Sequence, residues 1–450
     1  MEILRTLILI ESLTLGMLLC LAAAYFYFQS RRITDTRVFG LFSLIFYYCM
    51  PGILGALSPS LLRVVVPLAG KEVLLPLAIA LPLMMASVLV GIFFRFGRAK
   101  RRTPTQEWKL AKQLAVRYRP GRLFLVSLVF FILGLIGVYR ELNAAGGWFA
   151  VIKGGSSAYL EARVTGTVGF WGVLMSFIPI AAIGMIYSTV LGKAVPRELR
   201  WPIVLAILVG SIGLISLLTV RHLSTMLLLS VVALLEIRSR KLFRMVAPIL
   251  LILIAIGAVA LASLRYSSKS RNIDQLTANF EQIRISERII GAFNLRDYIW
   301  GGNIPDMVVF LIPRAIWPQK PMGSSINRAV FFEFSKFGGV KVVGLLGEGY
   351  ASGGLLMVAV EGLIFGVLLR RMRSFWERRQ SNSFQFMAYG SIVLGYIYMS
   401  ARGGFVSPSA FTFIAMLGQL WFTNWSCGYI ENREKLQSPT RTRTNEAVTA

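Results

Sequence analysis

VLLPLAIALPLMMASVLVGIFF, residues 73–94, is an apolar stretch without a single charged side chain. It is about as long as the ~20 residues that cross the hydrocarbon core of a bilayer as an α-helix. Comparable runs recur along the chain, and only 15% of its 450 residues are charged, against about 25% in water-soluble domains. The short alternating segments typical of a membrane β-barrel do not occur. The sequence therefore predicts an all-α polytopic membrane protein.

Roughly eleven segments have the length and polarity of transmembrane helices. The first lacks a basic start and a clear cleavage site, so it is expected to be a retained span and not a signal peptide. The stretch 202–237 fits either two short spans or one tilted helix with a buried arginine, and charge parity favours two. The predicted spans are 3–28, 38–57, 72–95, 123–143, 168–191, 202–219, 221–237, 245–264, 351–369, 384–400 and 407–425.

The net charge of +27 does not indicate nucleic-acid binding, because the basic residues form short clusters between apolar runs instead of one basic face. Such clusters are typical of cytoplasmic loops. The other loops, at 58–70, 144–167 and 265–350, are expected outside, with the N-terminus outside and the C-terminal tail inside. The predicted cytoplasmic clusters are 30–37, 98–122, 193–200, 238–244 and 370–379.

This topology divides the chain into four parts. Residues 1–264 hold eight spans with basic cytoplasmic loops, 265–350 form one large loop, 351–425 hold three more spans, and 426–450 are a polar tail. Residues 98–122 fit a basic surface helix or a solvated connector equally well. Residues 274–300 fit one or two amphipathic helices, with charges expected mostly on a surface.

The last third of the large loop combines rigidity with positive charge. In VVFLIPRAIWPQKP, residues 308–321, three prolines stiffen the backbone. Arg314 and Lys320 are thereby held in place, and both suit phosphate oxygens. A lipid-linked pyrophosphate would fit this pair. The alternative is a structural loop whose cations meet lipid headgroups.

GLLGEGYASGG, residues 344–354, lies at the start of the ninth span. Its glycines allow another backbone segment or a ligand to approach closely. Its carboxylate, Glu348, lies near the start of a span, where an acid is unfavourable unless it is paired or has a function. Glu348 could bind sugar hydroxyls, pair with Arg314 or Arg328, or act as a general base, with Tyr350 beside it. Glu361, deeper in the same span, is the weaker candidate.

Further arginines fall on the outer side of the predicted topology: Arg221 at the turn after the sixth span, and Arg402 after the tenth. With Arg314, Lys320, Arg328 and Glu348, they predict a cation-lined pocket for an anionic amphiphile. His222, the single histidine, is expected to be a polar neighbour more than a base. No nucleotide, metal or hydrolase motif occurs, and the three cysteines have no paired spacing. No cofactor and no metal are therefore expected.

These residues resemble the O-antigen and oligosaccharide repeat-unit polymerases of bacteria, the Wzy type. The resemblance covers about residues 200–410, whereas the first 200 residues are similar in topology alone. It rests on IPRAIWPQKP (312–321), GEGYASGG (347–354), LLTVR (217–221), RGG (402–404) and an Arg-x10-Gly spacing from Arg328 to Gly339.

The resemblance implies a metal-independent glycosyltransferase at the periplasmic face of the bacterial inner membrane. Its substrates are undecaprenyl-pyrophosphate-linked oligosaccharides, and the growing glycan is transferred to the next lipid-linked unit. By residue, Arg314, Lys320 and Arg402 are expected to hold the donor pyrophosphate, with help from Arg221, and Glu348 to act as base or hydroxyl ligand. Membrane lipids are expected partners, a chain-length regulator is a further candidate, and nucleic acid is not expected.

Three other functions stay open from the sequence. An O-antigen ligase shares the helical bundle and cationic pocket, although such ligases usually carry a histidine in the large loop, and 265–350 contains none. A transporter or flippase for a lipid-linked anionic solute would need charge through the membrane, which the spans largely lack. A non-enzymatic subunit of a polysaccharide export complex is the third.

Overall fold

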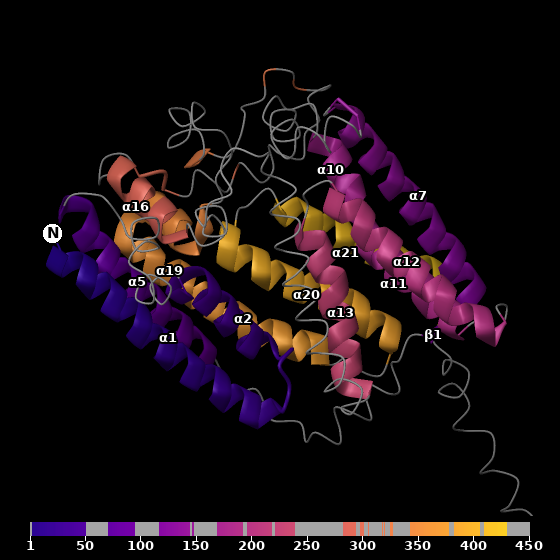
Figure 1. Ribbon diagram of the computed structural model, residues 1–450, viewed down its shortest axis with the longest axis horizontal. Coiled ribbons are helices and arrows are strands. Elements are labelled where there is room, and N and C mark those ends of the chain that lie inside the picture. The colour runs from indigo at the N-terminus through magenta and orange to yellow at the C-terminus, as the bar shows by residue number, and fades with distance from the viewer. Residues whose placement is uncertain are drawn as a thin grey trace, which may run out of the picture.

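The structure is a computed structural model of the 450-residue chain and forms a bundle of long helices (Figure 1). It describes residues 2–50, 71–94, 117–144, 146–147, 169–191, 196–217, 221–238, 282–293, 298–300, 343–377, 382–405 and 409–429, with single residues at 305, 317, 319, 325 and 326. The elements are α1 (Glu2–Ser30), α2 (Thr36–Leu44), the π-helix η1 (Ile45–Cys49), α5 (Lys71–Phe93), β1 (Arg117–Tyr118), α7 (Pro120–Ala144), α10 (Gly169–Met175), α11 (Phe177–Leu191), α12 (Arg197–Leu217), α13 (Arg221–Arg238), α16 (Gln282–Ala292), α19 (Gly344–Glu377), α20 (Ser383–Gly403), α21 (Ser409–Cys427) and β2 (Gly428–Tyr429).

Helices dominate the described part of the chain, and five stretches are long and apolar enough to cross a bilayer. The predicted class, an all-α membrane protein, is confirmed at this level. The number of spans and the side of the large loop stay predictions. The five stretches are Thr6–Ser30 in α1, Val73–Phe93 in α5, Pro120–Ala144 in α7, Trp171–Val190 across α10 and α11, and Gly344–Glu377 in α19.

Ten of the eleven predicted spans overlap with helices of the described part, and the eighth, 245–264, lies outside it. At 202–237 the structure has two helices, α12 and α13, which pack against each other. The prediction of two separate helices is therefore confirmed, whereas the two membrane crossings stay a prediction. Helix α19 already begins at Gly344, but it is broken at Gly353 and Gly354, so its second half begins close to the predicted boundary at 351. The helical turns before the break were not predicted. Residues 344–350 thus belong to a buried helix and not to the loop.

Two apolar cores share one helix. One core joins α1, α2, α5 and α19, and the other joins α7, α11, α13 and α21. Helix α20 contributes Val393 and Ile397 to the first core and Ile392 and Met399 to the second. It therefore lies between the two groups of helices, as Figure 1 shows. Residues on opposite sides of α20 connect the two halves.

Helices α5 and α19 approach each other closely. At Gly366 an added Cβ would overlap the Val88 carbonyl oxygen, and it would lie 3.0 Å from the Cα of Gly91. Contacts of this kind are typical of small residues at helix interfaces in membranes, where backbones come close together. The glycines of both helices therefore position α19, which carries two of the carboxylates considered below.

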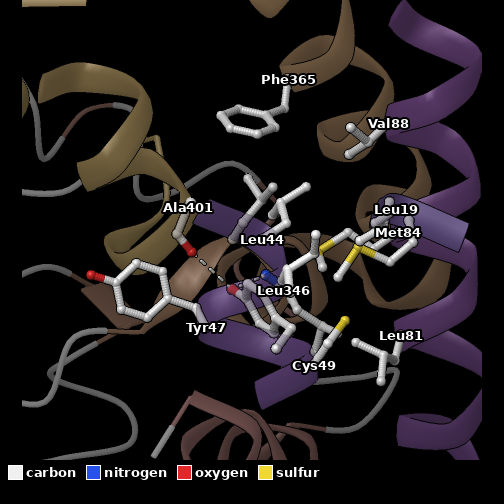
Figure 2. Close-up of a cluster of buried hydrophobic side chains, with 14 of the residues drawn as sticks. Leu19, Leu44, Tyr47, Cys49, Leu81, Met84, Val88, Leu346, Phe365 and Ala401 are labelled. Atoms are coloured by element: carbon white, nitrogen blue, oxygen red, sulfur yellow. Dashed lines mark hydrogen bonds between the residues drawn. The ribbon is translucent and has the colours of Figure 1, made fainter. Parts of the chain in front are cut away.

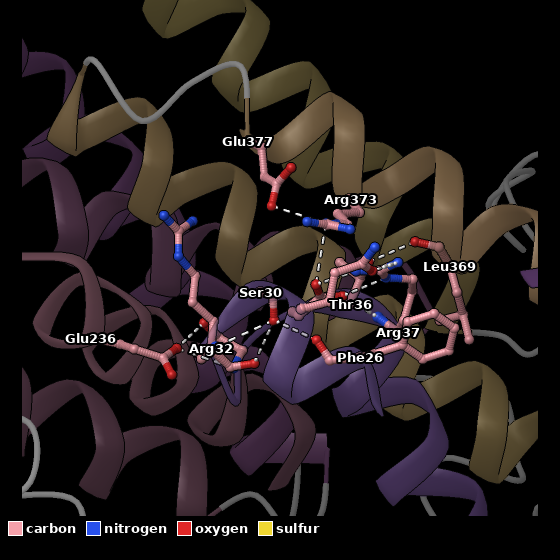
Figure 3. A network of polar contacts seen from close by, with 12 residues as sticks. Phe26, Ser30, Arg32, Thr36, Arg37, Glu236, Leu369, Arg373 and Glu377 are labelled. Carbon is pink, nitrogen blue, oxygen red and sulfur yellow. Dashed lines mark hydrogen bonds and ion pairs between the residues drawn. The ribbon is translucent and has the colours of Figure 1, made fainter. Parts of the chain in front are cut away.

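A polar network ties three helix ends together (Figure 3). Asp35, between α1 and α2, accepts hydrogen bonds from Arg37 Nη2 at 2.9 Å and forms an ion pair with Arg373 of α19 at 3.2 Å. Glu236 of α13 accepts from the backbone N–H groups of Ile33 at 2.5 Å and Thr34 at 3.1 Å. The turn between α1 and α2 is therefore bonded to α13 and α19.

The last turns of α19 and α21 and the first turn of α20 lie at this same end. Trp376 Nε1 donates to the Phe386 carbonyl at 2.9 Å, and Tyr118 packs edge-on against Phe384 at 4.9 Å. The strand β1, which contains Tyr118, pairs antiparallel with β2 directly after α21. Tyr118 is buried there, and this burial raises the pKa of its hydroxyl. Described parts of the basic segments predicted on the cytoplasmic side thus gather at one end, although the membrane side itself stays a prediction.

Helix α16 confirms one amphipathic helix within 274–300. The prediction that the charged side chains of this segment lie on a surface is wrong in part. Gln282, Ser286 and Glu287 are buried, because α16 packs against α19 and α5. Its isoleucines, including Ile285 and Ile289, form a small core against α19. The sequence showed the amphipathic pattern, but it did not show that both faces of the helix would be covered.

Candidate functional site

Helix α19 is broken at Gly353 and Gly354. Gly354 has φ +66° and ψ −150°, a conformation that favours glycine. A Cβ on Gly349 would lie 2.9 Å from the Cα of Val358, whereas nine residues of continuous helix rise about 13.5 Å. The first half of α19 (344–352) therefore folds back against the second half (355–377). Broken helices at membrane depth are typical of binding sites.

Glu348, on the first half of α19, is only 3% exposed. Its carboxylate lies against Gly404, where an added Cβ would overlap it. Gly404 has φ +82° and caps α20, donating its N–H to the Ser400 carbonyl at 2.9 Å. The GE and RGG segments, more than fifty residues apart in the sequence, thus meet side by side.

The side chain of Tyr48, from a third element of the fold, forms hydrogen bonds to the neighbourhood of both segments. It lies in η1, and single-turn π-helices are frequent at functional sites. Its hydroxyl donates to the Ala401 carbonyl at 3.2 Å and accepts from the Leu346 N–H at 3.3 Å, and Figure 2 shows Ala401 and Leu346 in this buried cluster. The hydroxyl thereby joins α20 to the first half of α19.

Gln282 of α16 extends the polar cluster. Its Oε1 and the Tyr48 hydroxyl each lie 2.7 Å from the position that a Cβ on Gly344 would occupy. Oε1 is buried and has no hydrogen-bond partner among the described residues. A buried polar atom without a partner is unfavourable, so this amide oxygen is available to a ligand.

Arg402 is the one predicted cation whose side chain the structure describes. It is partly buried in the last turn of α20, and its carbonyl oxygen lies 3.4 Å from a Cβ placed on Gly344. Its Nε is buried, and the Nε–H group donates no hydrogen bond to any atom of the described ranges. Arg402 also interacts electrostatically with Tyr47. The Nε–H group therefore retains donor capacity, two residues before the Gly404 backbone that contacts Glu348.

Glu361 is a stronger candidate for a site residue than its sequence position suggested. It is 8% exposed on the second half of α19, and its Oε2 lies 3.3 Å from a Cβ placed on Gly349. That oxygen has no hydrogen-bond partner in the described part of the chain. The fold-back of α19 therefore places a second buried carboxyl group beside the residue that follows Glu348.

The remaining predicted residues fall into two groups. Tyr350 is 7% exposed on the first half of α19, and its ring packs edge-on against Tyr298 at 5.9 Å. Arg221 is the first residue of α13, at the end of that helix opposite Glu236. The other group, Arg314, Lys320 and Arg328, lies outside the described residues, so the structure does not test their placement.

Sequence reasoning missed Tyr48 and Gln282. Tyr48 lies in an apolar run, where a tyrosine is interpreted as part of the hydrophobic core, and Gln282 lies in a segment that was interpreted as surface. The described ranges contain no cluster of three or more histidine, cysteine, aspartate or glutamate side chains that could hold a metal. The site is thus built from carboxylates, a guanidinium, an amide and phenols.

Comparison with known proteins adds no relative. No protein-family model matches the sequence, and no curated protein and no solved structure is similar to it.

Proposed function

We propose that the protein polymerises undecaprenyl-pyrophosphate-linked oligosaccharide units, as an O-antigen or exopolysaccharide polymerase at the periplasmic face of the inner membrane. The observation that carries the proposal is the contact between Glu348 and Gly404. This contact brings together the two described motifs, GEGYASGG and RGG, through which the chain resembles such polymerases. A carboxylate that can accept a proton, with an arginine two residues before the glycine that it contacts, suits transfer from a phosphate leaving group.

In the proposed reaction, a hydroxyl of the acceptor sugar attacks the anomeric carbon of the donor glycan. The bond between that carbon and the pyrophosphate oxygen breaks, and undecaprenyl pyrophosphate leaves with the bonding electrons. Glu348 accepts the hydroxyl proton. Arg402, with Arg314, Lys320 and Arg221, stabilises the negative charge on the departing pyrophosphate. Arg328 and Tyr350 complete the substrate-binding surface.

The test uses the purified protein in liposomes with a synthetic undecaprenyl-pyrophosphate-linked repeat unit. Glu348→Gln is expected to slow chain growth by about 10²-fold or more, as for loss of a general base. Arg402→Ala is expected to weaken turnover too. The matched controls are Glu198→Gln and Arg31→Ala, which change exposed residues away from the cluster. Normal glycan ladders from both Glu348→Gln and Arg402→Ala would contradict the site.

The same preparation separates the alternatives. An O-antigen ligase would transfer a finished glycan to a lipid A core acceptor without lengthening it. A flippase would move fluorescent lipid-linked units across the bilayer without forming a glycosidic bond. A non-enzymatic subunit would do neither alone. Chain growth by the isolated protein is the outcome that the proposal requires.

A further inference from the structure

The segment Tyr298–Trp300 covers the break in α19. The Ile299 N–H donates to the Ala351 carbonyl at 2.9 Å, which satisfies a carbonyl that the interrupted helix leaves free. The Tyr298 hydroxyl lies 2.6 Å from a Cβ placed on Gly354, and the Trp300 ring lies 3.3 Å from one placed on Gly353. The two glycines therefore leave space into which this segment fits.

Trp300 combines backbone strain with an exposed ring. Its φ is +47°, a conformation that is unfavourable for a non-glycine residue and that clusters at ligand-binding sites. Its ring packs edge-on against Tyr298, with centroids 5.8 Å apart and an interplanar angle of 87°. Even so, Trp300 is 66% exposed. The surroundings thus hold the indole in one direction and leave much of it uncovered.

A role in anchoring the protein to lipid would not require this strain. Tryptophans at membrane interfaces need only the correct depth, and Trp425 shows the simpler arrangement, since it is 72% exposed on the ordinary helix α21. At Trp300, the contacts with Tyr298 and with the break in α19 offset the unfavourable energy of the backbone conformation. A rigid, exposed aromatic surface reduces the ordering that a ligand must impose on the protein.

The position of the Trp300 ring indicates which part of the substrate it would bind. Tyr298 also packs edge-on against Tyr350, which lies two residues after Glu348. The indole therefore lies beside the break that ends the half-helix carrying Glu348, where we place glycosyl transfer. It lies on another side of that half-helix than the carboxylate, because residues two apart on a helix do not face each other. A pyranose ring has a face of C–H groups that stacks on an aromatic surface, whereas its hydroxyls stay at the rim for polar partners.

We propose that Trp300, supported from behind by Tyr298, is a stacking platform for a sugar ring of the lipid-linked oligosaccharide, next to the reacting unit. The inference rests on the proposed polymerase function, because it identifies the glycan and not the lipid as the part bound here. It also separates two recognition tasks: the cations bind pyrophosphate, and the aromatic platform binds saccharide.

A binding experiment tests the platform without any polymerisation. The soluble repeat-unit oligosaccharide, freed from its lipid, is titrated into the full-length protein in detergent while tryptophan emission is recorded. Wild type and Trp425→Phe are expected to give the same saturable change, and Trp300→Phe to lose it. The same three proteins are then placed in liposomes containing brominated lipid. Strong quenching of Trp300 by that lipid, without an oligosaccharide response, would overturn the proposal in favour of a lipid contact.

A kinetic experiment tests its contribution to turnover. Trp300→Ala is expected to raise the KM for lipid-linked units about tenfold, the equivalent of about 1.4 kcal/mol, with kcat little changed. Trp300→Phe should retain part of the affinity, and Trp425→Ala should match wild type. An unchanged KM in an actively polymerising Trp300→Ala protein would refute the platform. A wild-type protein that binds the oligosaccharide at Trp300 but never forms chains would refute the polymerase function and leave the platform standing.

Discussion

The carboxylate of Glu348 lies against the backbone of Gly404, and two separate requirements meet at that glycine. Its φ of +82° disfavours any residue with a Cβ, and a Cβ would also overlap the carboxylate. The Tyr48 hydroxyl bonds to both flanking segments, at Ala401 and Leu346. The position of the proposed base thus depends on residues of α20 and η1 as well as on its own helix.

Gly404→Ala is therefore expected to displace Glu348. We expect chain growth to fall at least tenfold and the protein to lose about 1–3 kcal/mol of stability, from backbone strain and the new overlap. Thermal unfolding in detergent and the liposome polymerisation assay measure the two effects. Gly418→Ala is the control, because nothing lies within 4 Å of the added Cβ. Equal behaviour of the two variants would contradict the contact.

At the scale of elements, α19 connects the two ends of the bundle. Its first half carries Glu348, and its last turns reach the Asp35 network through Arg373. The Asp35 side chain is fully buried and also caps the start of α2 by accepting from the Arg37 N–H at 3.0 Å. Asp35 therefore compensates two arginines and begins a helix. Loss of either partner of a buried ion pair leaves the other uncompensated.

We expect Asp35→Ala to destabilise the protein by about 3–5 kcal/mol, because Arg37 and Arg373 then lose their shared carboxylate. Glu377→Ala, which removes the partly exposed partner of Arg373, should change stability by about 0–1 kcal/mol. Denaturant-induced unfolding in mixed micelles compares the two variants. Similar midpoints for both would show that the network contributes little to holding α1, α2 and α19 together.

At the scale of the whole molecule, the polar cluster and the Asp35 network occupy opposite ends of α19. Arg31 lies beside the network, after α1, whereas Asn143 lies in the last turn of α7. Both side chains are exposed. If the basic end faces the cytoplasm, then the proposed active site and Asn143 face the periplasm.

Cysteine labelling tests this orientation. In a variant with Cys20, Cys49 and Cys427 replaced by serine or alanine, Asn143→Cys is expected to react with a membrane-impermeant maleimide in intact cells with a permeabilised outer membrane. Arg31→Cys should react only after the inner membrane is opened. The reverse pattern would place the site on the cytoplasmic side and would exclude a periplasmic polymerase.

The sequence by itself determined the helical membrane class, the positions of most helices and the grouping of the basic segments. These follow from local properties: the length of an apolar run sets a span, and nearby charge sets its end. It also singled out Glu348 and Arg402 by their scarcity in apolar surroundings. Only the tertiary structure decided that α19 folds back at Gly353 and Gly354, that Gly404 receives the Glu348 carboxylate, and that Tyr48 and Gln282 join the cluster. These contacts join segments far apart in the chain, and their formation depends on which helix faces pack together, which a local pattern does not encode.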